Sequence, residues 1–395
     1  MSTLSLPREI KVDPGSIHQL GKAVLANGGT KPLIIIDSFL AQAPLNLHEK
    51  IRSILHHDQL ECTFFSDYTG EPTVDHVQDA LNLLDQCSAD CIVAVGGGSA
   101  IDISKAVSFF GWNPEIKWND IPIQSRLNRM PLIAVPTTAG TGSEATRVMV
   151  ITDTQAEVKM NPGHDHLIPD VAILDPELTI SLPKHFTVFT GLDALTHAIE
   201  AYVSNRSTTM TDLYALEAIR MIGKSLPKVY NDGSDLKERQ EMILAGCYAG
   251  IAFSNSSTNL AHAAGRPLGT RFHIPHGLSV ALLLPFVMQF GLETSDDLYA
   301  DIAVALGADA SEDRNKLAQS AVKIVKDYNE QFGIWEAARN YIKNMDDLNK
   351  AIPLLVEDAL SGNGINTNRK VPSYGDIEKV YTSLSEKLAE TTVGT

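Results

Sequence analysis

An apolar run that ends in three glycines constrains the fold of this chain more than any other feature. Residues 91–95 (Cys-Ile-Val-Ala-Val) are continuously apolar, and Gly96, Gly97 and Gly98 follow them directly. Runs of this length are typical of parallel strands that are buried on both faces. Because the residues after the glycines have a helical pattern, the sequence predicts a strand, a tight turn and a helix in succession.

Similar units recur through the first half of the chain. Short apolar runs predict further strands at residues 33–36, 62–65, 132–135 and 171–174. Apolar residues at helical spacing predict a helix at 77–84, and residues 148–160 have the pattern of a hairpin. This alternation predicts an α/β domain over residues 1–183, with a doubly wound, mostly parallel sheet.

The second half has a different character. Beyond Pro183 strand patterns almost vanish, and Leu213, Leu216, Ile219 and Ile222 have the spacing of one helical face. We therefore predict an all-α domain over residues 184–395. A cleft between two such domains is the usual place for a ligand.

Four residues of this second half have the chemistry of a metal site. Asp193 and His197 are four positions apart and would share one face of a helix. His262 and His276 are fourteen apart, with a proline and glycines between them, so two successive elements would have to bring them together. One carboxylate and three imidazoles suit Fe(II) or Zn(II) better than Ca(II) or Mg(II).

The glycines of the first half indicate a phosphate site. They let backbone N–H groups approach a diphosphate, and the helix N-terminus adds partial positive charge. Residues 136–144 (Pro-Thr-Thr-Ala-Gly-Thr-Gly-Ser-Glu) are rich in hydroxyl groups and predict a second wall of hydrogen-bonding groups. The residues expected to bind the nucleotide here are Gly96, Gly97, Gly98, Ser99, Asp102, Thr137, Thr138, Thr141 and Ser143.

Composition excludes several classes of protein. A net charge of −16 disfavours nucleic acid and anionic membranes as partners. The four cysteines form no CxxC pair, which favours a reducing, cytoplasmic setting. We expect no membrane span, because no apolar run reaches ~18 residues.

The motifs together resemble the iron-containing (group III) alcohol dehydrogenase family. The blocks that carry the resemblance, in the family's order, are residues 96–105, 136–144, 169–176, 191–204, 262–277 and 366–369. The resemblance implies a nicotinamide cofactor on the first domain and a divalent metal on the second. It places Asp193, His197, His262 and His276 on the metal-ligand positions, with Fe(II) first and Zn(II) or Mn(II) as alternatives.

The resemblance also extends the cofactor site. Asp37 falls on the acidic position that ends the first cofactor strand, where a carboxylate bonds the adenosine ribose and repels a 2′-phosphate. NAD(H) is therefore expected rather than NADP. We also expect Lys159 and Leu178 to contact the cofactor.

The chain departs from the family pattern at two positions. Glu71 stands where the family often has asparagine, which leaves its role open. Arg266 stands where the family commonly has histidine, and an arginine cannot act as a general base near neutral pH. We expect Arg266 to bind an acidic group on the substrate, and His273 is a candidate for proton transfer.

These observations predict a metal- and NAD(H)-dependent alcohol dehydrogenase or aldehyde reductase that forms a homodimer or larger homo-oligomer. The expected substrate is a small aldehyde or alcohol with a sulfonate, carboxylate or phosphonate group, such as sulfoacetaldehyde or succinic semialdehyde. Three alternatives remain open at this point. They are a dehydrogenase of neutral short alcohols or diols such as 1,2-propanediol, a non-redox synthase or lyase of the related dehydroquinate synthase-like fold, and a metal-binding protein that has lost catalysis.

Overall fold

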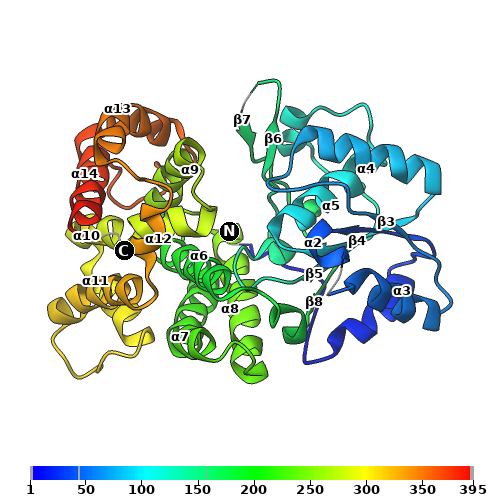
Figure 1. Ribbon diagram of the computed structural model, residues 1–395, viewed down its shortest axis with the longest axis horizontal. Helices are drawn as coiled ribbons and strands as arrows, with labels where there is room; N and C mark the ends of the chain where they lie inside the picture. Colours follow the sequence, from blue (N-terminus) through cyan, green and yellow to red (C-terminus); the bar gives the residue numbers. More distant parts are fainter. Residues whose placement is uncertain (1–2, 43–44, 157, 392–395) are drawn as a thin grey trace. The chain divides into compact units, whose positions relative to one another are not determined.

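The computed structural model describes residues 3–42, 45–156 and 158–391, and Figure 1 shows their helices and strands. These residues form two compact units. One comprises Ser5–Leu182 together with Ser234–Ser254, and the other mainly comprises Pro183–Gly233 and the residues from Asn255 onward. The predicted limits 1–183 and 184–395 stay a prediction about domains. One helix of the second half, α8 (Leu236–Asn255), groups with the first unit.

The first unit is built on a six-stranded sheet in which all paired strands are parallel, in the order β1-β8-β5-β4-β2-β3. Its strands are β1 (Glu9–Val12), β2 (Pro32–Ile36), β3 (Thr63–Phe65), β4 (Cys91–Gly96), β5 (Leu132–Pro136) and β8 (Val171–Leu174). The predicted α/β architecture is confirmed. The direction of winding reverses between β2 and β4, and open α/β sheets bind ligands beyond the carboxyl ends of the strands at such a point.

Alternate side chains of β2 enter two different cores, one on each face of the sheet. Ile34 and Ile36 pack with residues of α1 (Leu20–Ala26) and α3 (Leu47–His57). Leu33 and Ile35 pack with residues of α4 (Val74–Cys87) and α5 (Gly98–Phe110), so helices cover both faces (Figure 1). Every residue of β2 is buried, which explains its continuous apolar sequence.

This unit has two further features, a hairpin and the close packing of α8 on the loop that follows β5. β6 (Ile151–Asp153) and β7 (Val158–Met160) pair in antiparallel fashion, which confirms the predicted hairpin. Helix α8 packs closely on the loop, because a Cβ built on Gly250 would lie 2.6 Å from the carbonyl oxygen of Gly142. Gly142 itself has a left-handed backbone with φ of 62°. Glycine at both positions therefore permits this close approach.

The second unit is helical, as the loss of strand patterns predicts. Its helices are α6 (Lys184–Val203), α7 (Thr209–Asn231), α9 (Leu260–Phe272), α10 (His276–Ala305), α11 (Arg314–Gln331), α12 (Ile334–Arg339), α13 (Met345–Ser361) and α14 (Tyr374–Glu390). The four residues predicted to share one face of α7 are not equally buried. Ile219 and Ile222 are fully buried, but Leu213 is 69% exposed.

Helix α10 forms the centre of this unit and packs against α6, α9, α11 and α14. Among the described residues it is the one helix that is long and apolar enough to cross a membrane by length and composition alone. However, 56% of its apolar window is buried inside the protein. The sequence predicted no membrane span, because no continuous apolar run reaches ~18 residues.

Candidate functional site

Three helices of the second unit bring the four predicted metal ligands together. α6 carries Asp193 and His197 one turn apart, α9 carries His262, and α10 begins at His276. The Oδ1 atom of Asp193 lies 3.4 Å from His262 Nε2 and 3.7 Å from His276 Nε2. His197 Nδ1 lies 3.9 Å from the same oxygen, and its ring stacks on that of His262 with 4.2 Å between centroids.

These distances fit a divalent metal. Metal–ligand bonds of about 2.1 Å place tetrahedral ligand atoms roughly 3.4 Å apart. The ligand atoms of Asp193, His262 and His276 all lie within 4.8 Å of one another. Asp193 Oδ1 and His262 Nε2 are buried, and neither atom has a hydrogen-bond partner among the described residues. Buried polar atoms without partners mark a place where a ligand is expected.

The electrostatics of Asp193 and His197 favour the forms that bind metal. Burial alone would raise the pKa of Asp193, but the histidines around it outweigh this effect and hold the pKa well below its usual range. Burial lowers the pKa of His197 well below its ordinary value, although Asp193 opposes the change. Ionised carboxylates and neutral imidazoles are the forms that coordinate metals.

Glu200 is a buried member of this cluster that the sequence reasoning missed. Its Oε2 lies 2.6 Å from His262 Nδ1, on the side of the ring away from Asp193. Burial opposes ionisation of His262, but Glu200 and Asp193 outweigh it and raise the pKa of His262 to about 9. The spacing could have revealed Glu200, because positions 193, 197 and 200 lie on one face of a helix.

Arg266 lies one helical turn beyond His262 on α9 and is partly buried. Burial lowers its pKa, and the carboxylates of Glu200 and Asp193 oppose this effect. Within the described part of the chain, its guanidinium makes no hydrogen bond or ion pair. Glu71, whose role the sequence left open, is paired with Lys159, 2.6 Å away. A permanent positive charge is therefore held near the metal ligands without a bonded counter-charge.

His273 has a different position from the four ligands. It ends α9 in a left-handed conformation with φ of 55°, and its backbone N–H donates to Gly269. Its side chain is exposed, and no hydrogen bond of its ring is found among the described residues. The left-handed backbone of His273 is explained by its position at the end of α9. Its role in proton transfer stays a prediction.

In the first unit, the glycine turn leads directly from β4 into α5. The helix begins at Gly98, and no side chain caps its N-terminus. The N–H groups of its first turn are thus available to an anion. A Cβ built on Gly96 would lie 2.7 Å from the Cβ of Ala100, so the turn has no room for a larger residue.

The hydroxyl-rich loop faces this turn. The backbone N–H of Thr137 donates to the carbonyl of Gly96 over 3.0 Å. A Cβ built on Gly97 would lie 3.5 Å from Thr138, and one built on Gly98 would lie 3.0 Å from Thr141. The structure therefore brings together the glycines and threonines that the sequence singled out for the nucleotide.

Two residues of the predicted nucleotide set lie below the surface of these loops. Ser143 donates to Asp102, and Asp102 also accepts from the backbone of Val150 over 2.8 Å. The buried Lys105 donates to Ser143 over 3.0 Å and to Thr146 over 2.9 Å. Asp102 and Ser143 thus hold the two loops together from inside, whereas Ser99 is partly exposed at the start of α5.

The remaining predicted cofactor residues, Asp37, Lys159 and Leu178, lie in three different parts of this unit. Asp37 follows β2, lies 3.8 Å from a Cβ built on Gly96, and caps the short helix α2 (Ser38–Ala41). Lys159 is held by Glu71, as described above. Leu178 is buried and packs into the core beneath α1 and α3. Asp37 is therefore the one of these three whose place matches the switch point of the sheet.

Comparison with known proteins decides the family. Residues 7–176 match the family described as iron-containing alcohol dehydrogenase, and residues 187–385 match the Fe-containing alcohol dehydrogenase family, C-terminal. The chain belongs to the iron-containing alcohol dehydrogenase family. It is 42% identical over 318 residues to the probable alcohol dehydrogenase EutG of Escherichia coli (strain K12), covering 80% of each chain.

Solved structures of related enzymes share the fold over nearly the whole chain. A 1,3-propanediol oxidoreductase superposes with a TM-score of 0.92 at 30% identity, covering 97% of this chain and 100% of that one. A sulfoacetaldehyde reductase from Bifidobacterium kashiwanohense, in complex with NAD⁺, gives a TM-score of 0.85 at 25% identity, covering 98% and 99%. This chain is thus an oxidoreductase of the alcohol dehydrogenase type. The alternatives of a synthase or a non-catalytic metal-binding protein find no support in these matches.

Proposed function

We propose that this iron-containing alcohol dehydrogenase uses NAD(H) to interconvert a small aldehyde that carries an acidic group and the corresponding alcohol. The observation that carries the substrate class is Arg266. Its guanidinium lies one turn from His262, is partly buried, and makes no hydrogen bond or ion pair within the described residues. A planar guanidinium matches a carboxylate, sulfonate or phosphonate with two parallel hydrogen bonds.

The geometry of the helical unit supports the proposed metal set. Asp193, His197, His262 and His276 would hold the ion, with Fe(II) proposed first and Zn(II) or Mn(II) able to use the same ligands. A bound ion supplies Lewis acidity, which polarises a substrate oxygen. Asp193, His197 and His262 are buried, whereas the side chain of His276 is 39% exposed, so three of the four ligands are shielded from water.

Binding of the cofactor is assigned to the loops at the switch point of the sheet. The uncapped N-terminus of α5 and the glycines before it would hold the diphosphate. Thr137, Thr138 and Thr141 would bond the neighbouring parts of the nucleotide. The carboxylate of Asp37 would bond the ribose and repel a 2′-phosphate, which favours NAD(H) over NADP(H).

Arg266 also limits how a proton leaves the substrate. Because a guanidinium stays charged near neutral pH, it orients the acidic tail and does not accept the hydroxyl proton. Water, the cofactor ribose or the exposed imidazole of His273 would take that proton. We further propose a cytoplasmic location and a homo-oligomer; all four cysteines are free thiols, as expected in a reducing compartment.

A neutral substrate is the second candidate. The similarity to a 1,3-propanediol oxidoreductase favours it, whereas the similarity to a sulfoacetaldehyde reductase favours an anionic one. A substrate screen separates the two. Metal-reconstituted enzyme with NADH would be offered propionaldehyde, lactaldehyde, succinic semialdehyde, sulfoacetaldehyde, sulfolactaldehyde and phosphonoacetaldehyde, while consumption of NADH is followed. The proposal expects the highest kcat/KM among the anionic aldehydes, and a neutral aldehyde at the head of the series would contradict it.

A further inference from the structure

Glu200 makes three contacts at one point where α6 meets α9. Its Oε1 accepts a hydrogen bond of 2.6 Å from the backbone N–H of Ala261 and lies 3.4 Å from that of His262. Its Oε2 lies 2.6 Å from His262 Nδ1. Glu200 and His262 are 2% and 1% exposed, so water does not compete for these contacts.

The carboxylate is fixed in orientation by the start of α9. This helix begins at Leu260, and its own N-cap residue, Asn259, makes no side-chain cap. Glu200 supplies the cap from α6 instead, because Ala261 and His262 belong to the first turn, whose N–H groups lack helical partners. Asn259 in turn donates to the backbone carbonyl of Glu200 over 3.0 Å. One oxygen of Glu200 is thereby held at the backbone and the other at the imidazole.

This arrangement determines which nitrogen of His262 carries the proton. A neutral imidazole has one N–H, and an ionised carboxylate only accepts hydrogen bonds. Nδ1 must therefore be the donor to Glu200, which leaves Nε2 with a free lone pair. Nε2 faces Asp193 Oδ1 at 3.4 Å and has no hydrogen-bond partner among the described residues.

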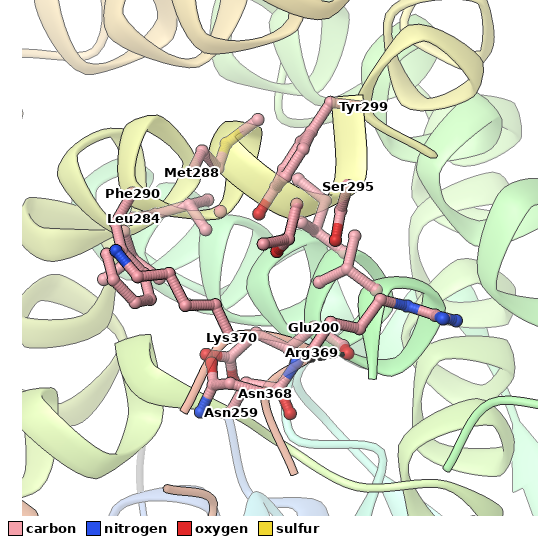
Figure 2. Close-up of a pocket in the computed structure, with 15 residues that line it drawn as sticks. Glu200, Asn259, Leu284, Met288, Phe290, Ser295, Tyr299, Asn368, Arg369 and Lys370 are labelled. Carbon is pink, nitrogen blue, oxygen red and sulfur yellow. Dashed lines mark hydrogen bonds between the residues drawn. The ribbon is translucent and has the colours of Figure 1, made fainter. Parts of the chain in front are cut away.

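The two cationic side chains near Glu200, those of Arg369 and Lys370, make their contacts elsewhere. Figure 2 shows Glu200 beside a small cavity of about 20 Å³, room for about one water molecule. The Arg369 and Lys370 side chains extend away from Glu200 in opposite directions. Arg369 donates to Ser207, and Lys370 is paired with Glu293 and Asp376. Neither of these cations therefore takes the carboxylate away from His262.

We propose that Glu200 is a positioning residue that holds His262 in the Nδ1–H tautomer and thereby presents Nε2 to the metal. The inference rests on the metal set of the proposed function. Partners of this kind orient ligand histidines, and their removal typically weakens metal binding about 10- to 100-fold. If Glu200 served only to cap α9, a variant that keeps the hydrogen bond from the Ala261 N–H would bind metal as tightly as wild type.

Glu200→Gln separates these two roles. The glutamine oxygen can still accept from the Ala261 N–H, which turns the amide nitrogen toward His262 Nδ1. That nitrogen is a donor, so Nδ1 must become an acceptor and the proton moves to Nε2, the metal-facing atom. The variant therefore keeps the volume and the cap but reverses the tautomer. Tyr299→Phe is the matched control, because Tyr299 lines the same cavity and makes no hydrogen bond to Glu200 within the described residues.

The experiment uses the full-length chain and two readouts. Nitrogen-15 NMR of histidine in the metal-free protein at alkaline pH, where the ring is neutral, reports the tautomer of His262. Co(II) titration, followed by its visible absorption, reports metal affinity. We expect an Nδ1–H signal in wild type and an Nε2–H signal in Glu200→Gln, with Co(II) affinity lower by about 10- to 100-fold. Tyr299→Phe should behave as wild type in both.

Two results would overturn the inference. One is an Nε2–H tautomer in the wild-type protein, a measurement that needs neither the variant nor a metal. The other is wild-type Co(II) affinity in Glu200→Gln. A wrong metal set would give a different result. Wild type would then keep its Nδ1–H tautomer, but it would either show no tetrahedral Co(II) spectrum or show one that persists in His276→Ala.

Discussion

Asp193 Oδ1 and His262 Nε2 come from two different helices, lie 3.4 Å apart, and are both buried without a hydrogen-bond partner among the described residues. Buried polar atoms that make no hydrogen bond mark a place where a ligand is expected, and an ion bound between these two would contact both. Together with His197 and His276, they are the strongest structural argument for a metal in this alcohol dehydrogenase.

The first prediction concerns this ligand set. Replacement of Asp193, His197, His262 or His276 by alanine should abolish tight metal binding and activity together, because each removes one of four ligands. Metal content after dialysis, compared with NADH-dependent activity, checks the prediction. A full equivalent of metal in any two of these variants would show that the ligands are wrongly assigned.

The second prediction concerns cofactor choice. Asp37→Ser should raise the relative efficiency with NADPH, because it removes the carboxylate that repels a 2′-phosphate. Serine also retains a cap for α2, where Asp37 now accepts from the N–H of Phe39 over 2.9 Å. The ratio of kcat/KM for NADH and NADPH should therefore change while thermal stability does not. A native preference for NADPH would refute the role of Asp37.

The third prediction concerns the ion pair beneath the loops proposed to bind the cofactor. Lys105 is fully buried, lies 3.6 Å from Asp102, and donates to Ser143, Thr146 and the carbonyl of Val148. Lys105→Met should lower the free energy of unfolding by about 3–5 kcal/mol, because it leaves the buried Asp102 unpaired. Urea denaturation measures the loss.

A second substitution tests the cause of that loss. In the double variant Lys105→Met/Asp102→Leu the buried carboxylate of Asp102 is also removed, so part of the stability should return. The effect of Asp102→Leu would be measured in wild type and in Lys105→Met. If it lowers the stability of both by the same amount, the two residues are not coupled and the account is contradicted.

The sequence predicted the sheet well because its strands are buried on both faces. β2 and β4 are continuous apolar runs, which leave little choice of structure. β1 (Glu9–Val12) was missed, since its sequence mixes charged and apolar residues and it becomes a strand by pairing with β8. The identity of a strand at the edge of a sheet depends on its partner, which local sequence does not contain.

The helical half shows the same limit. Periodicity placed Leu213 on one face of α7 with Ile219 and Ile222. Leu213 is nevertheless exposed, whereas Ala215, Ile219 and Ile222 are the residues buried against the neighbouring helices. Motifs predicted the four ligands that the structure brings together, but the role of Glu200 depends on a contact between residues 200 and 262. Likewise, Asp102 lies in a cofactor motif, while its observed hydrogen bonds are to the protein.

The most direct test of the proposed function measures substrate charge against Arg266. We would compare kcat/KM for sulfoacetaldehyde and propionaldehyde in metal-reconstituted wild type, in Arg266→Ala and in Arg271→Ala, an exposed arginine on the same helix. The account predicts that wild type strongly prefers the anionic aldehyde and that Arg266→Ala loses about 1.5–3 kcal/mol of this preference, roughly 10- to 150-fold in kcat/KM. Arg271→Ala should keep it. Equal efficiency of wild type on the two aldehydes, or a preference that survives Arg266→Ala, would contradict the account.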